Sequence, residues 1–412
     1  RDAGELEKEH LYDPIERLAQ RLISSGIAKE EELNDIRKEI KDQVDEDTRW
    51  VLEQDQPKPE DALTYVFSDK DPDLEYEKSK PAGNPIVMVD AINHALHEEM
   101  ERDEKVIVFG EDVAEMKGGV FTATKGLTEK FGRQRCYNSP LAEASILGTA
   151  CGLAIQGFRP VVEIQFGDYI WPGMQQLRNQ ISTLRYRSHN QYECPMVIRV
   201  PIGGYIHGGL CHSQNIESIF AHMPGYKIAM PSNAADAKGL LKTAIMLDDP
   251  VMFLEHKGLY RQGFSRAPEP DADYYLPFGK ANVVREGSDL TIVAYGAMVQ
   301  KAVNAAKKYA SKENVDIEVI DLRTIVPLDS ETIINSVKKT NRVIVLYEDL
   351  EFIGFGAEIA SQIADKAFEY LDAPVMRVAA KYTPIPFAAQ MENFILPSDE
   401  DVEKAVDRLI HY

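Results

Sequence analysis

Residues 138–166, NSPLAEASILGTACGLAIQGFRPVVEIQF, contain a sharp turn, a helix of small residues and an apolar strand. The helix is predicted at about 142–156, where alanine and glycine recur, and the strand at 160–166, where Val, Ile and Phe prevail. A turn, a helix and a buried strand in this order form the unit from which doubly wound sheets are built. The stretch therefore predicts an α/β fold with mostly parallel sheets.

The same alternation continues on both sides of this stretch. A polar, proline-containing segment at 262–277, which we interpret as a linker, separates two series of strands and helices. The predicted strands are residues 106–110, 160–166, 195–201, 226–231 and 250–256, then 290–295, 316–320, 342–347 and 374–379. The predicted helices are residues 86–102, 142–156, 172–187 and 234–247, then 298–311, 329–340, 355–371 and 398–410. Two doubly wound domains are therefore expected, at residues 84–262 and 278–412.

Residues 1–83 follow a different pattern and are predicted to form a helical arm that ends in a linker. Asp13-Pro14 is a typical helix start, and Gly26 is a natural stop. A second helix, from about Lys29, carries one apolar stripe on an otherwise charged surface. The stripe consists of Leu33, Ile36, Ile40, Val44 and Val51. This is too little apolar surface for a separate core, so the arm is expected to pack on another body.

The bulk composition is that of a soluble globular protein. A net charge of −21 over 412 residues argues against nucleic-acid binding, and no apolar run is long enough to span a membrane. The four cysteines lack metal-ligand or redox spacing, so free thiols are expected in the cytoplasm, or in the mitochondrial matrix of a eukaryote. The chain begins at Arg1, and we expect it to be part of a longer protein.

Glu143 is the first candidate functional residue. One alternative is a structural role, as the partner of a helix cap. If Ser139 caps the helix and Pro140 is its first residue, however, the capping-box position falls on Ala142, one residue early. Glu143 then follows the carboxyl end of a strand, where open α/β sheets bind their ligands.

The segment PLAEASILGTACGLAIQGFRPVVEIQF resembles the pyrimidine-binding domain of the beta subunit of 2-oxo acid dehydrogenase decarboxylase components. These thiamine-diphosphate-dependent enzymes belong to the transketolase superfamily. The resemblance implies that Glu143 bonds a ring nitrogen of the aminopyrimidine and favours the imino tautomer, which removes the proton from the thiazolium carbon. It continues through VVEIQFGDYIWP, where Tyr169 matches the aromatic that stacks on the aminopyrimidine. Leu141 and Gln165 match other cofactor-side residues, and core packing is the alternative for Tyr169.

Two further segments resemble the same family. In GLCHSQNIESIFAHMPG, His212 matches the histidine at the substrate end of the pocket, which orients the lipoyl acceptor and transfers protons. In VFGEDVAEMKGGVF, Glu111 matches a carboxylate near the cofactor, in a tunnel that connects two active sites. The alternatives are a structural histidine and a solvated loop acid. His222 is assigned to structure.

The C-terminal part and the arm carry separate resemblances. DLRTIVPLD and YEDLEFIGFGAEIA resemble the transketolase-type C-terminal domain, although Gly354 and Gly356 could also form a phosphate loop. DPIERLAQRLISSGIAKEEELNDI resembles the C-terminal tail of the alpha subunit. The chain has no Gly-Asp-Gly motif of the kind that binds diphosphate and magnesium in this family. The magnesium ligands are therefore expected on an alpha-type half, upstream or on another chain, and not here.

The resemblance implies the function. It predicts an oxidoreductase of class EC 1.2.4 that decarboxylates a 2-oxo acid and passes the acyl group to a lipoyl-bearing acyltransferase core. An assembly of two alpha-type and two beta-type units is the family expectation. VVEIQF, the HSQ segment and the alpha-like tail favour a branched-chain substrate, with pyruvate as the alternative. A transketolase-like or deoxyxylulose-phosphate-synthase-like enzyme and a noncatalytic scaffold remain as rivals.

Overall fold

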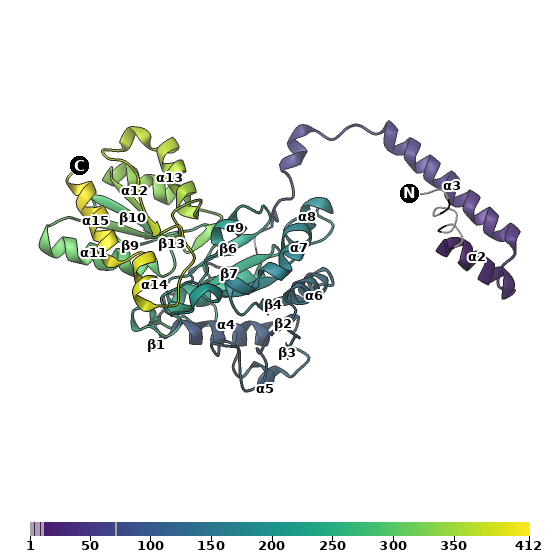
Figure 1. The fold of residues 1–412 in the computed structure, drawn as a ribbon, viewed down its shortest axis with the longest axis horizontal. Helices are drawn as coiled ribbons and strands as arrows, with labels where there is room; N and C mark the ends of the chain where they lie inside the picture. Colours follow the sequence, from purple (N-terminus) through teal and green to yellow (C-terminus); the bar gives the residue numbers. More distant parts are fainter. Residues whose placement is uncertain (1–3, 5–8, 10–11, 71) are drawn as a thin grey trace. The chain divides into compact units, whose positions relative to one another are not determined.

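The computed structural model describes residues 4, 9, 12–70 and 72–412. The chain divides into two compact units, one that ends at Leu63 and one that runs from Thr64 to Tyr412. In the described residues the first unit consists of helices, and the second contains sheets covered by helices (Figure 1). Since the candidate site residues all follow Thr64, the second unit carries them.

The first unit contains α2 (Pro14–Ser24), α3 (Glu30–Glu53) and the 3-10 helix η1 (Pro59–Leu63). As predicted, α2 begins after Asp13, whose carboxylate accepts the Ile15 backbone N–H at 2.8 Å. An ion pair of 2.9 Å between Arg37 and Glu16 joins α3 to α2. None of the described residues of these two helices is buried. The apolar stripe of α3 is therefore open to solvent in this chain.

The first sheet of the second unit has seven strands in the order β12-β6-β7-β5-β4-β2-β3. All neighbours are parallel except β12, which runs antiparallel to β6 at one edge. The strands are β2 (Val106–Gly110), β3 (Cys136–Asn138), β4 (Arg159–Glu163), β5 (Val197–Ile202), β6 (Lys227–Ala229), β7 (Val251–His256) and β12 (Thr324–Val326). The central strands are buried throughout because helices cover both faces of the sheet, as their apolar runs predict.

Two layers of helices cover this sheet. One face packs against α4 (Met88–Arg102) and α10 (Ala234–Met246), and the other against α6 (Glu143–Ile155). Shorter helical segments connect the strands. They are α5 (Leu127–Phe131), η2 (Gly167–Tyr169), η3 (Trp171–Gly173), α7 (Met174–Gln176), the π-helix η4 (Leu177–Ile181), α8 (Leu184–Arg187), η5 (Gly209–Cys211), α9 (Glu217–Ala221) and η6 (Lys257–Leu259).

The second sheet has five strands in the order β14-β13-β10-β11-β9, parallel except for β9 at one edge. They are β9 (Asn282–Arg285), β10 (Leu290–Ala294), β11 (Ile317–Asp321), β13 (Val343–Leu350) and β14 (Met376–Ala380). Its helices are α11 (Met298–Lys312), α12 (Ser330–Thr340), α13 (Phe355–Lys366), η8 (Phe368–Tyr370), α14 (Ala389–Ile395) and α15 (Asp399–Ile410). Helices α11 and α15 cover one face, and α12 and α13 cover the other (Figure 1).

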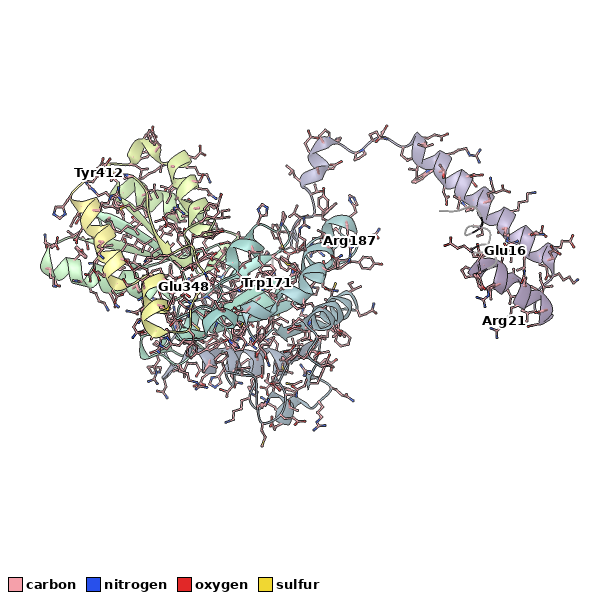
Figure 2. All side chains as sticks on the ribbon, in the orientation of Figure 1. Glu16, Arg21, Trp171, Arg187, Glu348 and Tyr412 are labelled. Atoms are coloured by element: carbon pink, nitrogen blue, oxygen red, sulfur yellow. The ribbon has the colours of Figure 1, made fainter. Side chains whose placement is uncertain are left out.

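One continuous hydrophobic core joins the two sheets. It contains Ile198 of β5 together with Val293 and Val345 of the second sheet. A buried hydrogen bond of 2.6 Å between His256 Nε2 and a carboxylate oxygen of Glu348 crosses the same boundary, and Figure 2 labels Glu348 there. The two predicted α/β series therefore form one packed body.

Two predicted elements differ in the structure. The helix expected at 172–187 is broken into η3, α7, η4 and α8, since it starts with Trp171-Pro172 and widens into a π turn. The linker expected at 262–277 is packed rather than free. It contains η7 (Gly263–Ser265) and β8 (Ala267–Pro268), and β8 pairs with β1 (Pro85–Ile86). In its second half Leu276 is fully buried.

The structure agrees with two simpler expectations. All four cysteines are free thiols, with Cys211 exposed and the other three buried. In the part of the chain that the structure describes, no helix combines the length and the apolar character needed to cross a bilayer.

Candidate active site

The predicted site residues lie at the carboxyl ends of neighbouring strands. Glu111 follows β2, Glu143 begins α6 shortly after β3, and Tyr169 follows β4 in η2. His212 lies in the connection after β5, directly behind η5. Because β5, β4, β2 and β3 are parallel neighbours, these connections meet at the same edge of the sheet.

The local structure frees Glu143 from a capping role, although by a different route from the one predicted. The helix begins at Glu143 itself, and its N-cap is Ala142, which makes no side-chain cap. Ser139 is not the cap that the capping argument assumed: its backbone N–H bonds the Gly110 carbonyl at 2.7 Å, which holds the turn against β2. Glu143 is half-buried in the first turn of the helix, where the helix dipole favours a negative group.

Glu111 lies close enough to Glu143 for the two carboxyl groups to affect each other. It is only 7% exposed, and Oε1 has no hydrogen-bond partner among the described residues. Burial raises the pKa of Glu111, and the negative charges of Glu143 and Asp112 raise it further. The Ala142 backbone N–H has the opposite effect and lowers it. Glu111 is therefore a buried carboxyl group beside Glu143 with a raised pKa, rather than the solvated loop acid of the alternative.

Tyr169 and His212 form a hydrogen-bonded pair. Tyr169 Oη and His212 Nε2 are 2.7 Å apart, and His212 Nδ1 is 3.2 Å from the Gly208 carbonyl oxygen. Since a carbonyl only accepts, Nδ1 carries the proton and Nε2 accepts from the tyrosine. Gly208 makes this loop possible, because a Cβ there would lie 2.8 Å from the His212 Cβ and carbonyl oxygen.

Phe166 joins these two rings and was not among the predicted residues. Its ring stands edge-to-face against His212 at 4.5 Å and against Tyr169 at 5.3 Å between centroids. Tyr169 is half-buried and packs against the edge of the core. Burial raises the pKa of its hydroxyl, with contributions from the charges of Glu111 and Glu143. The site residues therefore share one electrostatic environment.

Gln165 and Leu141 flank this group. The Gln165 amide lies 3.4 Å from both the Glu111 carbonyl and a carboxylate oxygen of Asp112, so it contacts the loop after β2. Leu141 is 83% exposed, in the turn that leads into α6. The structure thus brings Glu111, Gln165, Tyr169 and His212 together with Glu143, while Leu141 lies exposed beside them.

Two charged residues behind the site were also missed. Asp168 immediately precedes Tyr169, and Lys257 follows β7 in η6, at the same edge of the sheet. Lys257 directly follows the strand predicted at 250–256, and the sequence analysis gave it no functional role. Its place at the carboxyl end of a predicted strand is the signal that could have marked it.

The glycine loops have packing functions. A Cβ on Gly354 would lie 2.1 Å from the Leu350 carbonyl oxygen, and one on Gly356 would lie 2.0 Å from the Tyr347 ring. These contacts explain both glycines without a bound phosphate. Among the described residues, no group of three or more His, Cys, Asp or Glu side chains could hold a metal ion. The location of the magnesium ligands stays a prediction.

Comparisons with known proteins identify the family. Residues 84–262 match the family described as "Transketolase, pyrimidine binding domain", residues 279–402 match "Transketolase, C-terminal domain", and residues 1–60 match "Dehydrogenase E1 component". The chain is 46% identical over 325 residues to 2-oxoisovalerate dehydrogenase subunit beta of Bacillus subtilis (strain 168), which covers 79% of the chain and 98% of the relative. The chain belongs to the beta-subunit family of 2-oxo acid dehydrogenase E1 components. The predicted resemblance and enzyme class are thereby confirmed.

Other members of this E1 beta family have a different substrate in their names. The pyruvate dehydrogenase E1 component subunit beta of Staphylococcus epidermidis is 46% identical over 317 residues, 77% of the chain and 96% of the relative. The pyruvate dehydrogenase E1 component subunit beta of Bacillus subtilis (strain 168) is 45% identical over 327 residues, which cover 79% of the chain and 99% of the relative. Identity therefore does not separate a branched-chain from a pyruvate enzyme. Family membership does imply dependence on thiamine diphosphate and an alpha partner.

A solved structure supports the fold. A chain described as "Split gene transketolase, inactive beta4 tetramer" matches with a TM-score of 0.64, over 79% of this chain and 98% of its own length. At 24% sequence identity this likeness concerns the fold alone, and it confirms the predicted transketolase-like α/β architecture.

Proposed function

We propose that this chain supplies the aminopyrimidine half of a thiamine-diphosphate site in an enzyme that decarboxylates a 2-oxo acid oxidatively. The acyl group is then transferred to the lipoyl group of an acyltransferase core. The observation that carries this proposal is the convergence of Glu111, Glu143, Tyr169 and His212 at one edge of the sheet, in a member of the E1 beta family.

The residues present fit one half of such a cofactor. Glu143 is half-buried in the first turn of α6, Tyr169 presents a half-buried ring, and Glu111 has a buried carboxyl oxygen that bonds no described residue. Gln165 and Leu141 complete the proposed cofactor side. When bound, thiamine diphosphate supplies a thiazolium that stabilises the carbanion left by decarboxylation.

Glu143 and Glu111 have different proposed tasks. Glu143 hydrogen-bonds the aminopyrimidine and controls its protonation, a task that needs a carboxyl group because an amide cannot take up and release a proton at neutral pH. Burial and the charge of Glu143 raise the pKa of Glu111, so Glu111 takes up a proton more readily than an exposed glutamate does. The pair therefore offers two carboxyl groups to the cofactor side, and the pKa of Glu111 is the one that its surroundings raise.

His212 is proposed to orient the lipoyl acceptor and to transfer protons during acylation. Its two nitrogens bond Tyr169 Oη and the Gly208 carbonyl, which fixes the orientation of the ring. Tyr169 thus serves two partners in this proposal, with its ring toward the cofactor and its hydroxyl on His212.

The proposed partners complete the site. An alpha-type half, either upstream or on another chain, contributes the magnesium and diphosphate ligands, and two alpha-type and two beta-type units assemble. The lipoyl-bearing acyltransferase core accepts the acyl group. The bacterial relatives support a bacterial cytoplasmic enzyme, and they give the mitochondrial alternative no support. A branched-chain 2-oxo acid is the proposed substrate, with pyruvate as the alternative.

An acylation assay tests the function. The chain, assembled with its alpha-type half, thiamine diphosphate and magnesium, is mixed with a lipoylated domain and either 3-methyl-2-oxobutanoate or pyruvate. We expect the mass of the lipoylated domain to increase by the acyl group, with a higher kcat/KM for the branched-chain substrate. Transfer of a ketol group to an aldose without lipoyl acylation would support a transketolase instead, and an inert assembly would support a scaffold.

A further inference from the structure

Lys257 is a buried cation with an unusual surrounding. It is 5% exposed, and its Nζ makes no hydrogen bond to any residue that the structure describes. Among the described residues, the other two buried lysines form ion pairs. Lys238 lies 2.6 Å from Glu98, and Lys242 lies 2.8 Å from the same carboxylate. Because a buried charge without a partner is costly, packing alone does not explain why a lysine is buried at position 257.

The Lys257 ammonium faces the aromatic group of the site. Nζ lies 5.6 Å from the centroid of the Phe166 ring, within cation–π range. The Phe166 ring also contacts the His212 ring, and the two ring centroids are 4.5 Å apart. Burial lowers the pKa of Lys257 to about 8, although the charges of Asp168 and Glu348 oppose the shift. The side chain thus remains mostly cationic at neutral pH, behind the ring that supports His212.

Asp168 joins the segment of Tyr169 to the segment of His212. One of its carboxylate oxygens accepts the Gln214 backbone N–H at 3.3 Å, while the other is buried and bonds none of the described residues. This amide lies two residues after His212. The approach is close, since a Cβ on Gly167 would lie 3.3 Å from the Gln214 carbonyl oxygen. Burial raises the pKa of Asp168, while the Gln214 backbone N–H and the charge of Lys257 lower it.

We propose that Asp168 and Lys257 are a pair of positioning residues that hold His212 in its acceptor-facing orientation. Asp168 fixes the backbone behind the imidazole through the Gln214 N–H, and Lys257 fixes Phe166, against which the imidazole rests. Lys257 also supplies a positive charge that favours the charged form of the half-buried Asp168. This inference rests on the proposed function, because the role that it assigns is expressed through His212 in the acylation step.

Two half-reactions separate positioning from a general structural role. In the enzyme assembled with its alpha-type half, decarboxylation of 3-methyl-2-oxobutanoate is followed with 2,6-dichlorophenolindophenol, and acylation with a lipoylated domain. Asp168→Asn and Lys257→Met are each expected to slow acylation by at least about tenfold and decarboxylation by less than about threefold, since small displacements of a reacting group cost rate steeply. Equal losses in both half-reactions would overturn the proposal.

A double-variant cycle tests whether the effect acts through His212. In a His212→Ala background, Asp168→Asn and Lys257→Met are expected to cause no further loss of acylation, because residues that act through one group are not additive. Independent, multiplying losses would contradict the inference. Lys257→Arg, which keeps a cation over Phe166, should recover most of the acylation rate, and a failure to do so would count against the cation–π contact.

Carbethoxylation provides a readout without the cofactor. The rate at which diethyl pyrocarbonate modifies His212, measured by peptide mass spectrometry, is expected to rise at least about threefold in both variants as Nε2 is released from Tyr169. The matched control Lys238→Met removes a buried lysine on the α4 and α10 side and should leave this rate unchanged. An unchanged rate in Asp168→Asn overturns the inference. If wild-type enzyme failed both half-reactions, the proposed function would fall while this measurement would still decide the positioning.

Discussion

The seven-stranded sheet holds two sets of buried charges that differ in how they are satisfied. In its interior, Arg199 lies 2.7 Å from both Glu163 and Glu255, and the Tyr260 hydroxyl bonds Glu255 at 2.5 Å. At the carboxyl edge, Glu111 has a buried oxygen that bonds none of the described residues. The Arg199 set is thus closed by ion pairs and a hydrogen bond within the sheet, whereas Glu111 keeps bonding capacity that the described residues do not use.

The same contrast explains the opposite pKa shifts of two glutamates. For Glu348, burial alone would raise the pKa, but His256, the Gly204 N–H and Asn215 outweigh burial and lower it. For Glu111, burial and neighbouring negative charges act in the same direction and raise the pKa. The charged form of Glu348 thus contributes to stability, and that of Glu111 is held at a cost by the rest of the fold.

The largest expected effect comes from breaking the interior set. Arg199→Met leaves Glu163 and Glu255 buried without their cation, and should lower the free energy of unfolding by about 3–5 kcal/mol. The matched substitution Arg37→Met removes an exposed arginine from its ion pair with Glu16 and should cost at most about 1 kcal/mol. Urea unfolding of both variants measures the difference. Similar small losses would show that the interior charges are not structural.

Glu348→Gln should have the next largest effect, and the effect should depend on pH. Because the folded-state pKa of Glu348 is lowered, its stabilisation is present above the unfolded value of about 4.3 and disappears as the pH falls through the folded value. We expect a loss of about 2 kcal/mol at pH 7 that shrinks below about pH 4. Urea unfolding of the wild type and the variant at pH 7 and below about pH 4 measures how this loss changes with pH. A loss of the same size at both pH values would contradict the prediction.

Tyr169→Phe sharpens the comparison at the site edge. The ring remains, but the 2.7 Å hydrogen bond to His212 is lost, which corresponds to about 1 kcal/mol or roughly a fivefold reduction in lipoyl acylation. The affinity for thiamine diphosphate, followed by the quenching of intrinsic fluorescence, should change less. A larger loss in affinity than in acylation would place the hydroxyl on the cofactor instead.

Glu111→Gln should have the smallest effect on stability, below about 1 kcal/mol, and in the opposite direction to Glu348→Gln. Since the folded-state pKa of Glu111 is raised, the wild-type chain loses stability as the pH rises from about 4.3 to the folded value. The variant lacks this loss and should be relatively more stable at pH 7 than at pH 4. Thermal unfolding at the two pH values measures it, and a variant that is less stable at pH 7 would refute the shift.

Much of the fold followed from local sequence patterns, because parallel strands buried on both faces read as continuous apolar runs. What local patterns could not predict depends on distant pairing. Strand β12 follows β11 in sequence but joins the edge of the other sheet beside β6, and nothing within its own three residues marks that partner. The predicted helix at 172–187 also failed, since its π turn reflects tertiary packing rather than propensity.

For the site, the sequence predicted residues but not their contacts. Glu111, Glu143, Tyr169 and His212 were chosen individually, and their meeting at one edge depends on the strand order. The hydrogen bond from Tyr169 to His212 spans 43 residues in sequence and has no local signal. Lys257 was overlooked because its function, as we infer it, acts through Phe166 rather than through a motif.

The account rests on Glu143 as a residue that serves the cofactor and not the fold. The most direct test is Glu143→Gln in the assembled enzyme, with turnover and thermal unfolding measured on the same sample. We predict a loss of turnover of at least about 100-fold with a stability change of less than about 0.5 kcal/mol, since the side chain caps nothing and is half-exposed. Turnover within about twofold of wild type, or a loss of activity matched by unfolding, would contradict the account.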